Sequence, residues 1–366
     1  MAHPRKLLED IQGTMFEYLH QDEAEFLYEE VFVRRSYFQH GIRVEEGAVV
    51  VDAGANIGLL SLQCLREAKG VQIFAFEPIP VIYDVLVRNL FNASSGSVKE
   101  GTCPKPVALR VALGAEQAEE EFYFFRDNPG ESTRHRGERG EQRQALDADV
   151  DAASWRRVVE EGKHPGGEDV AGAHNGVCEY KPEGEGGEPS VCSVVPLSLA
   201  LHQLGVAGVD LLKVDVEGDE LAVLHGIDDD DWPKIRQIAL EVHDIDGRLA
   251  ATIRILTSEP AAFDEVCWQP LLTSEVKGYV MVVPKALKMF LVFAKRRPKK
   301  APSADDGSAG GRGAEAPSVT GSLLEGGEQA GGSHLPHIVG GSKGDSGAYE
   351  ETIPSSCCSC VSSVLR

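Results

Sequence analysis

The stretch VVVDAGANIGLL, residues 49–60, constrains the fold more than any other part of this sequence. Its three valines form an apolar β-branched run, which predicts a parallel strand that is buried on both faces. Asp52 follows at the carboxyl end, and Gly54 and Gly58 permit a tight turn into a helical pattern of apolar residues. A strand, a glycine turn and a helix in this order predict an open α/β sheet, in which ligands bind at the carboxyl ends of the strands.

The spacing of the glycines argues against two common nucleotide-binding motifs. Residues 54–58 are G-A-N-I-G, so the G-x-G-x-x-G fingerprint of dinucleotide-binding folds is absent, which weakens the case for a nicotinamide-dependent oxidoreductase. No Gly-Lys-Ser/Thr follows, so the turn is not a phosphate-binding loop of the P-loop type. An ordinary strand-to-helix turn that binds nothing is the alternative to a ligand site.

Polar residues also follow three further predicted strands. They come after the apolar runs at 71–76, 209–214 and 235–242: Glu77, then Asp215 and Glu217, and then His243 and Asp244. Because the carboxyl ends of parallel strands meet at one edge of a sheet, we expect these residues to lie near Asp52. Glu77 stands where an acid can accept both ribose hydroxyls of a nucleoside, although it can instead complement the dipole of the helix that follows.

Four segments together resemble the FkbM-type S-adenosylmethionine-dependent methyltransferases: VVVDAGANIGLLSL, FAFEPIPVIYDVLVRNL, LLKVDVEGDELAVLHGI and IALEVHD. The resemblance implies a class I, Rossmann-like α/β fold with a seven-stranded sheet, helices on both faces and an antiparallel last strand. It also implies S-adenosylmethionine as the methyl donor and, typically, a hydroxyl oxygen as the acceptor. The expected reaction is O-methylation of a small molecule, sugar or lipid.

The resemblance also assigns expected roles to residues of the motifs. The cofactor would contact the glycine turn and the tip of the second strand: Asp52, Gly54, Ala55, Asn56, Gly58, Glu77 and Pro78. Asp215, Glu217 and His243 would border the reaction site. Asp52 would either order the glycine turn or face the amino group of the cofactor.

An alcohol is a poor nucleophile, so a base should take its proton as the methyl group arrives. His243 is the first candidate by residue type, and Asp215 is the second, either as the base or as the group that orients the imidazole. The purely structural alternatives are that His243 caps the end of its strand and that the carboxylates of Asp215 and Glu217 order the next helix. No ligand spacing demands a metal ion.

The sequence also allows a function of a different class. The chain can be a catalytically inactive S-adenosylmethionine-binding module that acts as an interaction protein. The presence of Asn56, Glu77, Asp215 and His243 favours the enzyme.

The net charge and the cysteine pattern limit the binding partners and the cellular compartment that we expect. The formal net charge of −22 argues against nonspecific binding of nucleic acid and against docking on an anionic membrane surface. The eight cysteines include no C-x-x-C pair matched by a second one, which argues against zinc and for reduced thiols. We see no signal-peptide core and no apolar run long enough to span a bilayer, so we expect a cytoplasmic protein.

Composition predicts three units along the chain. They are a helical lead-in at 1–47, a methyltransferase domain at 48–297 with a low-complexity insertion at 131–190, and a disordered tail at 298–366. The lead-in has an acidic stretch that is either a solvated helix face or part of a lid over the cofactor site. The tail ends with Cys357, Cys358 and Cys360, which are either solvated thiols or sites of reversible acylation that would tether the protein to a membrane. Residues 279–283 and 289–294 are expected to form a final antiparallel pair.

Overall fold

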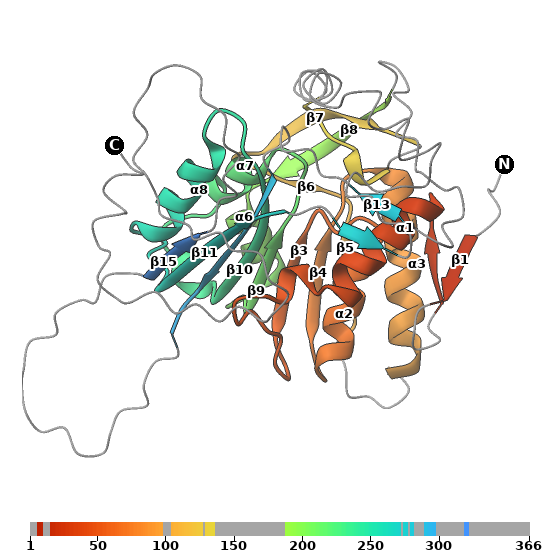
Figure 1. Cartoon of the computed structure of the whole chain (residues 1–366), viewed down its shortest axis with the longest axis horizontal. Helices are drawn as coiled ribbons and strands as arrows, with labels where there is room; N and C mark the ends of the chain where they lie inside the picture. The colour runs from red at the N-terminus through yellow and green to blue at the C-terminus, as the bar shows by residue number, and fades with distance from the viewer. Residues whose placement is uncertain are drawn as a thin grey trace, which may run out of the picture.

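The structure is a computed structural model that describes residues 6–9, 15–97, 104–126, 129–135, 187–271, 274–276, 279–281, 289–297 and 318–321. Its centre is one mixed sheet with the strand order β15-β11-β14-β10-β9-β3-β4-β5 (Figure 1). In chain order these strands are β3 (Val49–Ala53), β4 (Gln72–Phe76), β5 (Val107–Leu109), β9 (Leu211–Val214), β10 (Gln237–His243), β11 (Glu265–Pro270), β14 (Met289–Lys295) and β15 (Ser318–Gly321).

The directions of the strands confirm the expected class I sheet. β5, β4, β3, β9 and β10 run parallel to one another, whereas β14 is antiparallel to both of its neighbours, β10 and β11. These seven strands are the expected set, and β15 adds an eighth strand beside β11. The predicted final antiparallel pair was wrong, because β13 (Tyr279–Met281) pairs with β12 (Ser274–Val276) instead of with β14.

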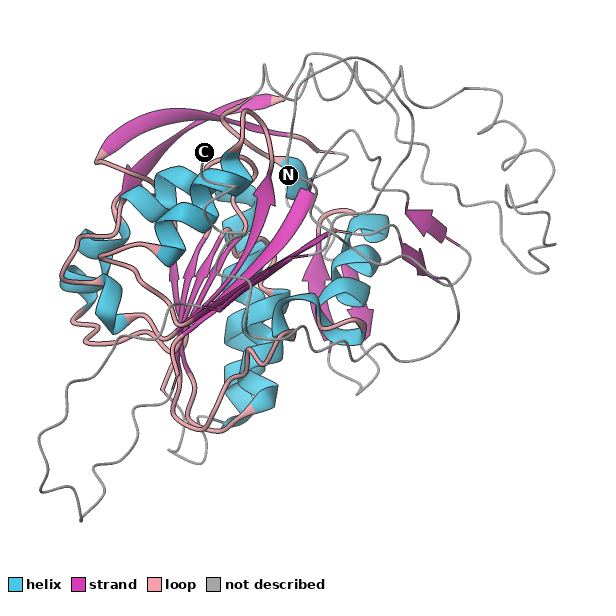
Figure 2. Cartoon of the chain, turned by 60° about the vertical axis from the view of Figure 1, so that its left-hand side comes forward, coloured by secondary structure: helices cyan, strands magenta, loops and turns pink. Residues whose placement is uncertain are grey.

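Helices cover both faces of the sheet, as Figure 2 shows. On one face α2 (Leu59–Glu67) and α3 (Pro80–Ser97) pack on the cluster that contains Val50. On the other face α6 (Leu197–Leu204), α7 (Glu220–His225) and α8 (Arg248–Thr257) pack on the cluster that contains Val51. Successive strand residues point to opposite faces, so an unbroken apolar run supplies both clusters at once.

The N-terminal segment packs on the same core cluster as α2 and α3. It contains the hairpin of β1 (Lys6–Glu9) and β2 (Met15–Tyr18), the helix α1 (Gln21–Tyr28), and two short turns, η1 (Glu29–Val33) and η2 (Ser36–Phe38). Phe16 and Tyr37 are buried in the core cluster of α2 and α3. Asn89 on α3 accepts a hydrogen bond from the amide of Glu17 at 2.7 Å. The segment is therefore part of the main body of the protein.

A small three-stranded sheet, with the order β6-β8-β7, stands beside the carboxyl end of the main sheet (Figure 1). Its strands are β6 (Ala112–Leu113), β7 (Ala118–Phe124) and β8 (Glu188–Val195). The short helix η4 (Pro129–Glu131) follows β7, and Thr133 forms a bridge with Tyr123.

Parts of the predicted insertion and of the predicted tail have defined secondary structure. Residues 129–135 and 187–190 belong to the fold, because they build η4, the Thr133 bridge and the start of β8. Within the predicted tail, β15 pairs with β11 in parallel. The remaining parts of both segments, including Cys357, Cys358 and Cys360, lie outside the described residues. Across the described part of the chain, we find no helix with the length and hydrophobicity that a membrane crossing requires.

Candidate active site

The glycine turn after β3 fits tightly between the ends of the neighbouring strands. The amides of Gly54 and Ala55 donate to the carbonyl oxygen of Phe76 at 3.0 and 2.9 Å. Gly54 has φ +71°, and a Cβ placed on it would lie 1.7 Å from the carbonyl oxygen of Asp215. Asn56 takes a left-handed conformation with φ +49°. Only glycine fits at position 54, because a side chain would meet the backbone that continues from β9.

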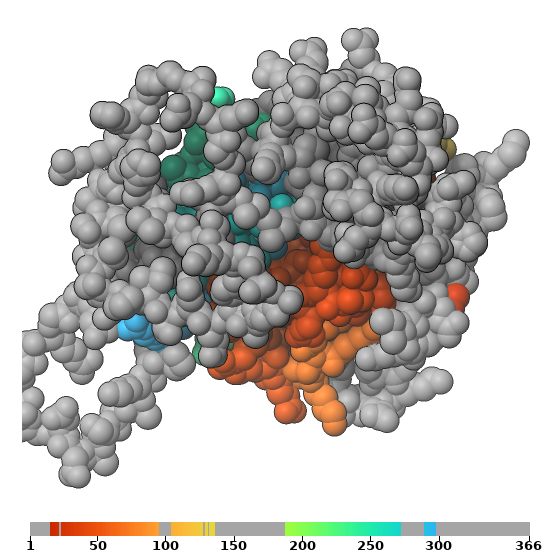
Figure 3. All heavy atoms as spheres, viewed as in Figure 1, coloured from red at the N-terminus to blue at the C-terminus, as the bar shows by residue number. Residues whose placement is uncertain are grey.

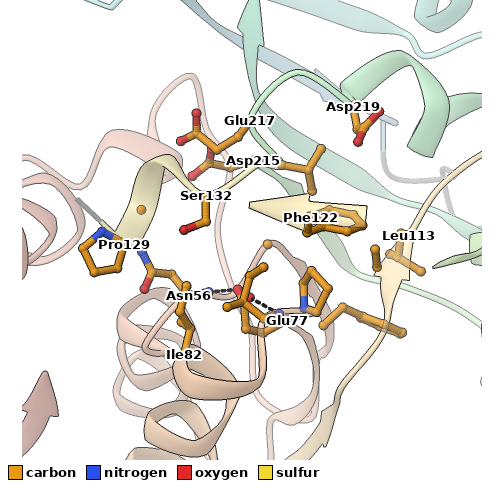
Figure 4. A pocket seen from close by; sticks show the side chains of 17 residues that line it. Asn56, Glu77, Ile82, Leu113, Phe122, Pro129, Ser132, Asp215, Glu217 and Asp219 are labelled. Atoms are coloured by element: carbon orange, nitrogen blue, oxygen red, sulfur yellow. Dashed lines mark hydrogen bonds between the residues drawn. The ribbon is translucent and has the colours of Figure 1, made fainter. Parts of the chain in front are cut away.

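Glu77 lies at the end of β4 and faces the turn. Its Oε2 accepts a hydrogen bond from the amide of Asn56 at 3.1 Å, and its Oε1 accepts one from the amide of Ile79 at 2.9 Å (Figure 4). Burial raises the pKa of the Glu77 carboxyl to about 7, although these two amide donors oppose the rise. The residue is only 5% exposed. Glu77 is therefore a buried acceptor that changes its charge near neutral pH.

A pocket opens at this edge of the sheet, and its two ends differ in polarity. Glu77 lies between an apolar end with Leu113 and Phe122 and a polar end with Asn56, Ser132 and Asp215 (Figure 4). Six of the expected site residues line it: Gly54, Asn56, Glu77, Pro78, Asp215 and Glu217. Asp52, Ala55, Gly58 and His243 are not among its lining residues.

Asp52 is fully buried behind the turn and not in the pocket wall. Its Oδ2 accepts a hydrogen bond from the hydroxyl of Ser61 at 2.6 Å. Lys213 on β9, which the sequence analysis did not single out, has its Nζ 3.5 Å from Asp52 and 3.4 Å from Asp215. The same Nζ donates to the carbonyl oxygen of Gly54 at 2.8 Å. Burial lowers the pKa of Lys213, but the two aspartates outweigh burial and raise it, so the ammonium group stays charged.

Asp215 also contacts the N-terminal segment. The hydroxyl of Tyr37 donates to its Oδ2 at 2.9 Å, and Tyr37 is 2% exposed. Glu217 follows two residues later with φ +54°, and its carbonyl oxygen accepts a hydrogen bond from Thr133 at 2.7 Å. These two acidic residues are thus fixed from two different parts of the chain.

His243 lies at the end of β10, surrounded by carboxylates. Its Nδ1 is 3.1 Å from Glu220, and its Nε2 is 3.5 Å from Glu217 and 3.9 Å from Glu241. Burial lowers the pKa of His243, but the hydrogen bond and charge of Glu220 and the charges of Glu217 and Glu241 raise it to about 10. The imidazole therefore holds its proton at neutral pH.

Two further buried acids stand near Asp215. Burial and the charge of Asp215 raise the pKa of Glu30 to about 8, and they also raise the pKa of Glu241. Glu30 belongs to the acidic N-terminal stretch for which a solvated helix face was one interpretation. That interpretation was wrong for Glu30, since it is 5% exposed. In the described part of the chain, no group of three or more His, Cys, Asp or Glu side chains has an arrangement that would hold a metal ion.

The seven strands from β11 to β5 with β14 reversed, the glycine turn after β3 and the acid after β4 define a class I methyltransferase fold. Within this class the chain belongs to the FkbM methyltransferase domain family, whose domain it matches over residues 52–266.

The chain is also similar in sequence to proteins from three organisms. The chain is 33% identical to the 31-O-demethyl-FK506 methyltransferase FkbM of Streptomyces tacrolimicus, over 67% of this chain and 84% of that protein. It is 32% identical to methyltransferase sdnD of Sordaria araneosa, over 62% and 77% of the two chains. It is 27% identical to methyltransferase 1 of Beauveria bassiana, over 75% and 90%. These matches confirm the family resemblance.

Proposed function

We propose that this protein is an S-adenosylmethionine-dependent methyltransferase that methylates a hydroxyl oxygen on a small molecule, sugar or lipid. The observation that carries the proposal is the convergence of the glycine turn, Glu77 and Asp215 on one pocket at the carboxyl edge of the sheet. The name of the Streptomyces tacrolimicus relative, a 31-O-demethyl-FK506 methyltransferase, supports an oxygen acceptor.

The pocket residues fit such a cofactor. Leu113 and Phe122 offer an apolar surface for a purine ring, and the Glu77 carboxylate lies next to them as an acceptor for ribose hydroxyls. Asn56 lines the pocket, and its buried Oδ1 has no hydrogen-bond partner among the described residues. A buried acceptor of this kind is costly unless a ligand supplies a donor.

When bound, the cofactor supplies a methyl group that its sulfonium centre has already activated. The protein then has to align the acceptor hydroxyl and remove its proton. Asp215 and Glu217 line the pocket wall that faces Asn56 and Glu77 (Figure 4), so a hydroxyl bound between them can donate to a carboxylate.

We assign the role of proton acceptor to Asp215, with Glu217 beside it, and not to His243. A histidine with a pKa of about 10 is already protonated at neutral pH and cannot accept a proton from an alcohol. His243 also lies behind Glu217, outside the pocket lining. We propose that its positive charge holds Glu217 and Glu220 in position.

Two measurements test the proposal. Calorimetry with S-adenosylhomocysteine tests cofactor binding, and transfer from methyl-labelled S-adenosylmethionine into a cell extract tests catalysis. Tight binding with label in a small molecule, sugar or lipid is the expected result. Binding without any transfer would favour the inactive module, and absence of binding would contradict the proposal altogether.

A further inference from the structure

The two oxygens of the Asp215 carboxylate have different surroundings. Oδ2 accepts a hydrogen bond from the hydroxyl of Tyr37 at 2.9 Å and lies 3.4 Å from Nζ of Lys213. In the described part of the chain, both of these donors contact Oδ2 and neither contacts Oδ1. The side chain is 22% exposed and lines the pocket, and Oδ1 is not among the buried oxygens that lack a hydrogen-bond partner. Oδ1 is therefore the oxygen that a molecule in the pocket can reach.

The hydroxyl of Tyr37 is held at Asp215 by a tightly packed part of the N-terminal segment. Tyr37 lies in η2, is 2% exposed and belongs to the core cluster of α2 and α3. Arg35, just before η2, forms an ion pair with Glu67 of α2. Figure 3 shows the N-terminal residues on the surface of the protein beside those of β3 and α2. A ring in a close-packed core has little room to move, so the hydroxyl keeps its place.

Tyr37 and Lys213 both act on Asp215 as donors. Burial and the charge of Asp215 raise the pKa of the Tyr37 hydroxyl well above its ordinary value of 10, so the hydroxyl keeps its proton at neutral pH. The charged Nζ of Lys213 lies 5.5 Å from the centroid of the Tyr37 ring and donates to the carbonyl oxygen of Gly54 at 2.8 Å. The carboxylate therefore cannot rotate without losing two contacts, one to η2 and one to β9.

We propose that Tyr37 is a positioning residue for methyl transfer. Together with Lys213 it holds Oδ2 of Asp215, so that Oδ1 faces the acceptor hydroxyl and takes its proton. The proton moves to Oδ1 as the oxygen–carbon bond forms and the sulfur–carbon bond breaks, and the neutral thioether keeps the electron pair of the broken bond. The inference rests on the proposed function. It gives the N-terminal segment a part in the reaction, because Tyr37 precedes residue 52, where the family match begins.

Tyr37→Phe in the full chain tests the role, because it removes the hydroxyl and keeps the ring. We expect label transfer into the cell extract at saturating S-adenosylmethionine to fall about 10-fold. The KM for S-adenosylmethionine and the affinity for S-adenosylhomocysteine should stay within about 2-fold of the wild-type values. The loss should persist as the amount of extract is raised, because a misoriented carboxylate slows turnover and not binding of the acceptor.

Tyr83→Phe is the matched control. The hydroxyl of Tyr83 donates to the carbonyl oxygen of Ala108 at 3.4 Å, and Tyr83 is not among the residues that line the pocket. This variant should transfer label at the wild-type rate.

A double variant separates positioning from support of the fold. If Tyr37 acts through the carboxylate, adding Tyr37→Phe to Asp215→Asn should change the residual rate by less than about 2-fold. A residue that only stabilises the fold would lower the rate equally in both backgrounds. Equal losses, or a wild-type rate in Tyr37→Phe alone, would overturn the positioning role while leaving the proposed function in place. A wild-type protein that transfers no label would overturn the proposed function and this inference with it.

Discussion

The carbonyl oxygen of Asp215 occupies the space beside Gly54 so closely that a Cβ on the glycine would lie 1.7 Å from it. The turn after β3 and the backbone that continues from β9 are therefore in direct contact. Lys213 reinforces the contact, because its ammonium group reaches the carbonyl oxygen of Gly54 and the carboxylate of Asp215. A displacement of one side must move the other.

Gly54→Ala should destabilise the protein by about 3 kcal/mol or more, because overpacking against backbone adds to the strain of a left-handed alanine. Gly47→Ala is the control, since Gly47 has φ +75° but nothing within 4 Å of its Cβ position. Gly47→Ala should lower the free energy of unfolding by only about 1–2 kcal/mol. Unfolding in denaturant measures both, and equal losses would show that backbone strain alone limits position 54.

Glu77 should make cofactor binding depend on pH. Its pKa of about 7 leaves the carboxyl half protonated at neutral pH, and the ionised form is the better acceptor for ribose hydroxyls. Affinity for S-adenosylhomocysteine should rise about 10-fold between pH 6 and pH 8. Glu77→Gln should bind about 10- to 100-fold more weakly at pH 8 and lose this dependence. Calorimetry across the range decides, and an unaltered profile in the variant would remove Glu77 from the binding site.

Asp215→Asn should lower methyl transfer by roughly 10²- to 10⁴-fold, because an amide does not take the proton of the acceptor. Its affinity for S-adenosylhomocysteine should stay close to that of the wild type. Label transfer into the cell extract measures the rate. His243→Gln serves for comparison, and a larger loss of rate in that variant than in Asp215→Asn would return the role of base to His243.

His243 should stabilise the folded protein most at acidic and neutral pH. Its pKa is about 10 in the folded protein, above the ordinary histidine value of 6.5, so folding favours the charged form. This stabilisation is complete below about pH 6.5 and is lost as pH rises through 10. His243→Gln should therefore cost about 3–5 kcal/mol at pH 6 and progressively less toward pH 10. Exposed His225 provides the control variant, His225→Gln, and a constant difference across pH would contradict the assignment.

Ionised Glu30 should destabilise the folded protein at alkaline pH. Its pKa of about 8 exceeds the ordinary value of 4.5, so its contribution to stability is present below about pH 4.5 and is lost as pH rises through 8. Glu30→Gln, which imitates the protonated acid, should raise the melting temperature by about 2–4 °C at pH 9 and have little effect near pH 5. The exposed Glu46→Gln variant should show no such trend, and thermal melts at both pH values test the difference.

The strand ends could be predicted from the sequence because each one follows an unbroken apolar run. Glu77 and Asp215 lie at one pocket for that reason. Lys213 was hidden inside such a run, where a single cation does not alter the pattern that predicts a strand. Tyr37 and Glu30 were missed because their partner Asp215 lies far along the chain, 178 residues beyond Tyr37, and local periodicity carries no information about such pairs.

The attachment of the segment between His135 and Gly187 has a consequence for how this protein can change in length. Tyr123 in β7 pairs with Thr133 before the segment and with Pro189 after it, so both ends are anchored on one strand. Arg126 and Glu188 form an ion pair at 2.6 Å at the same place. Once the ends of a loop are fixed in this way, each doubling of its length adds only about 0.6 kcal/mol of closure entropy. A short linker between His135 and Gly187 should therefore leave the strands in place, because Thr133 and Pro189 would keep their pairing with Tyr123.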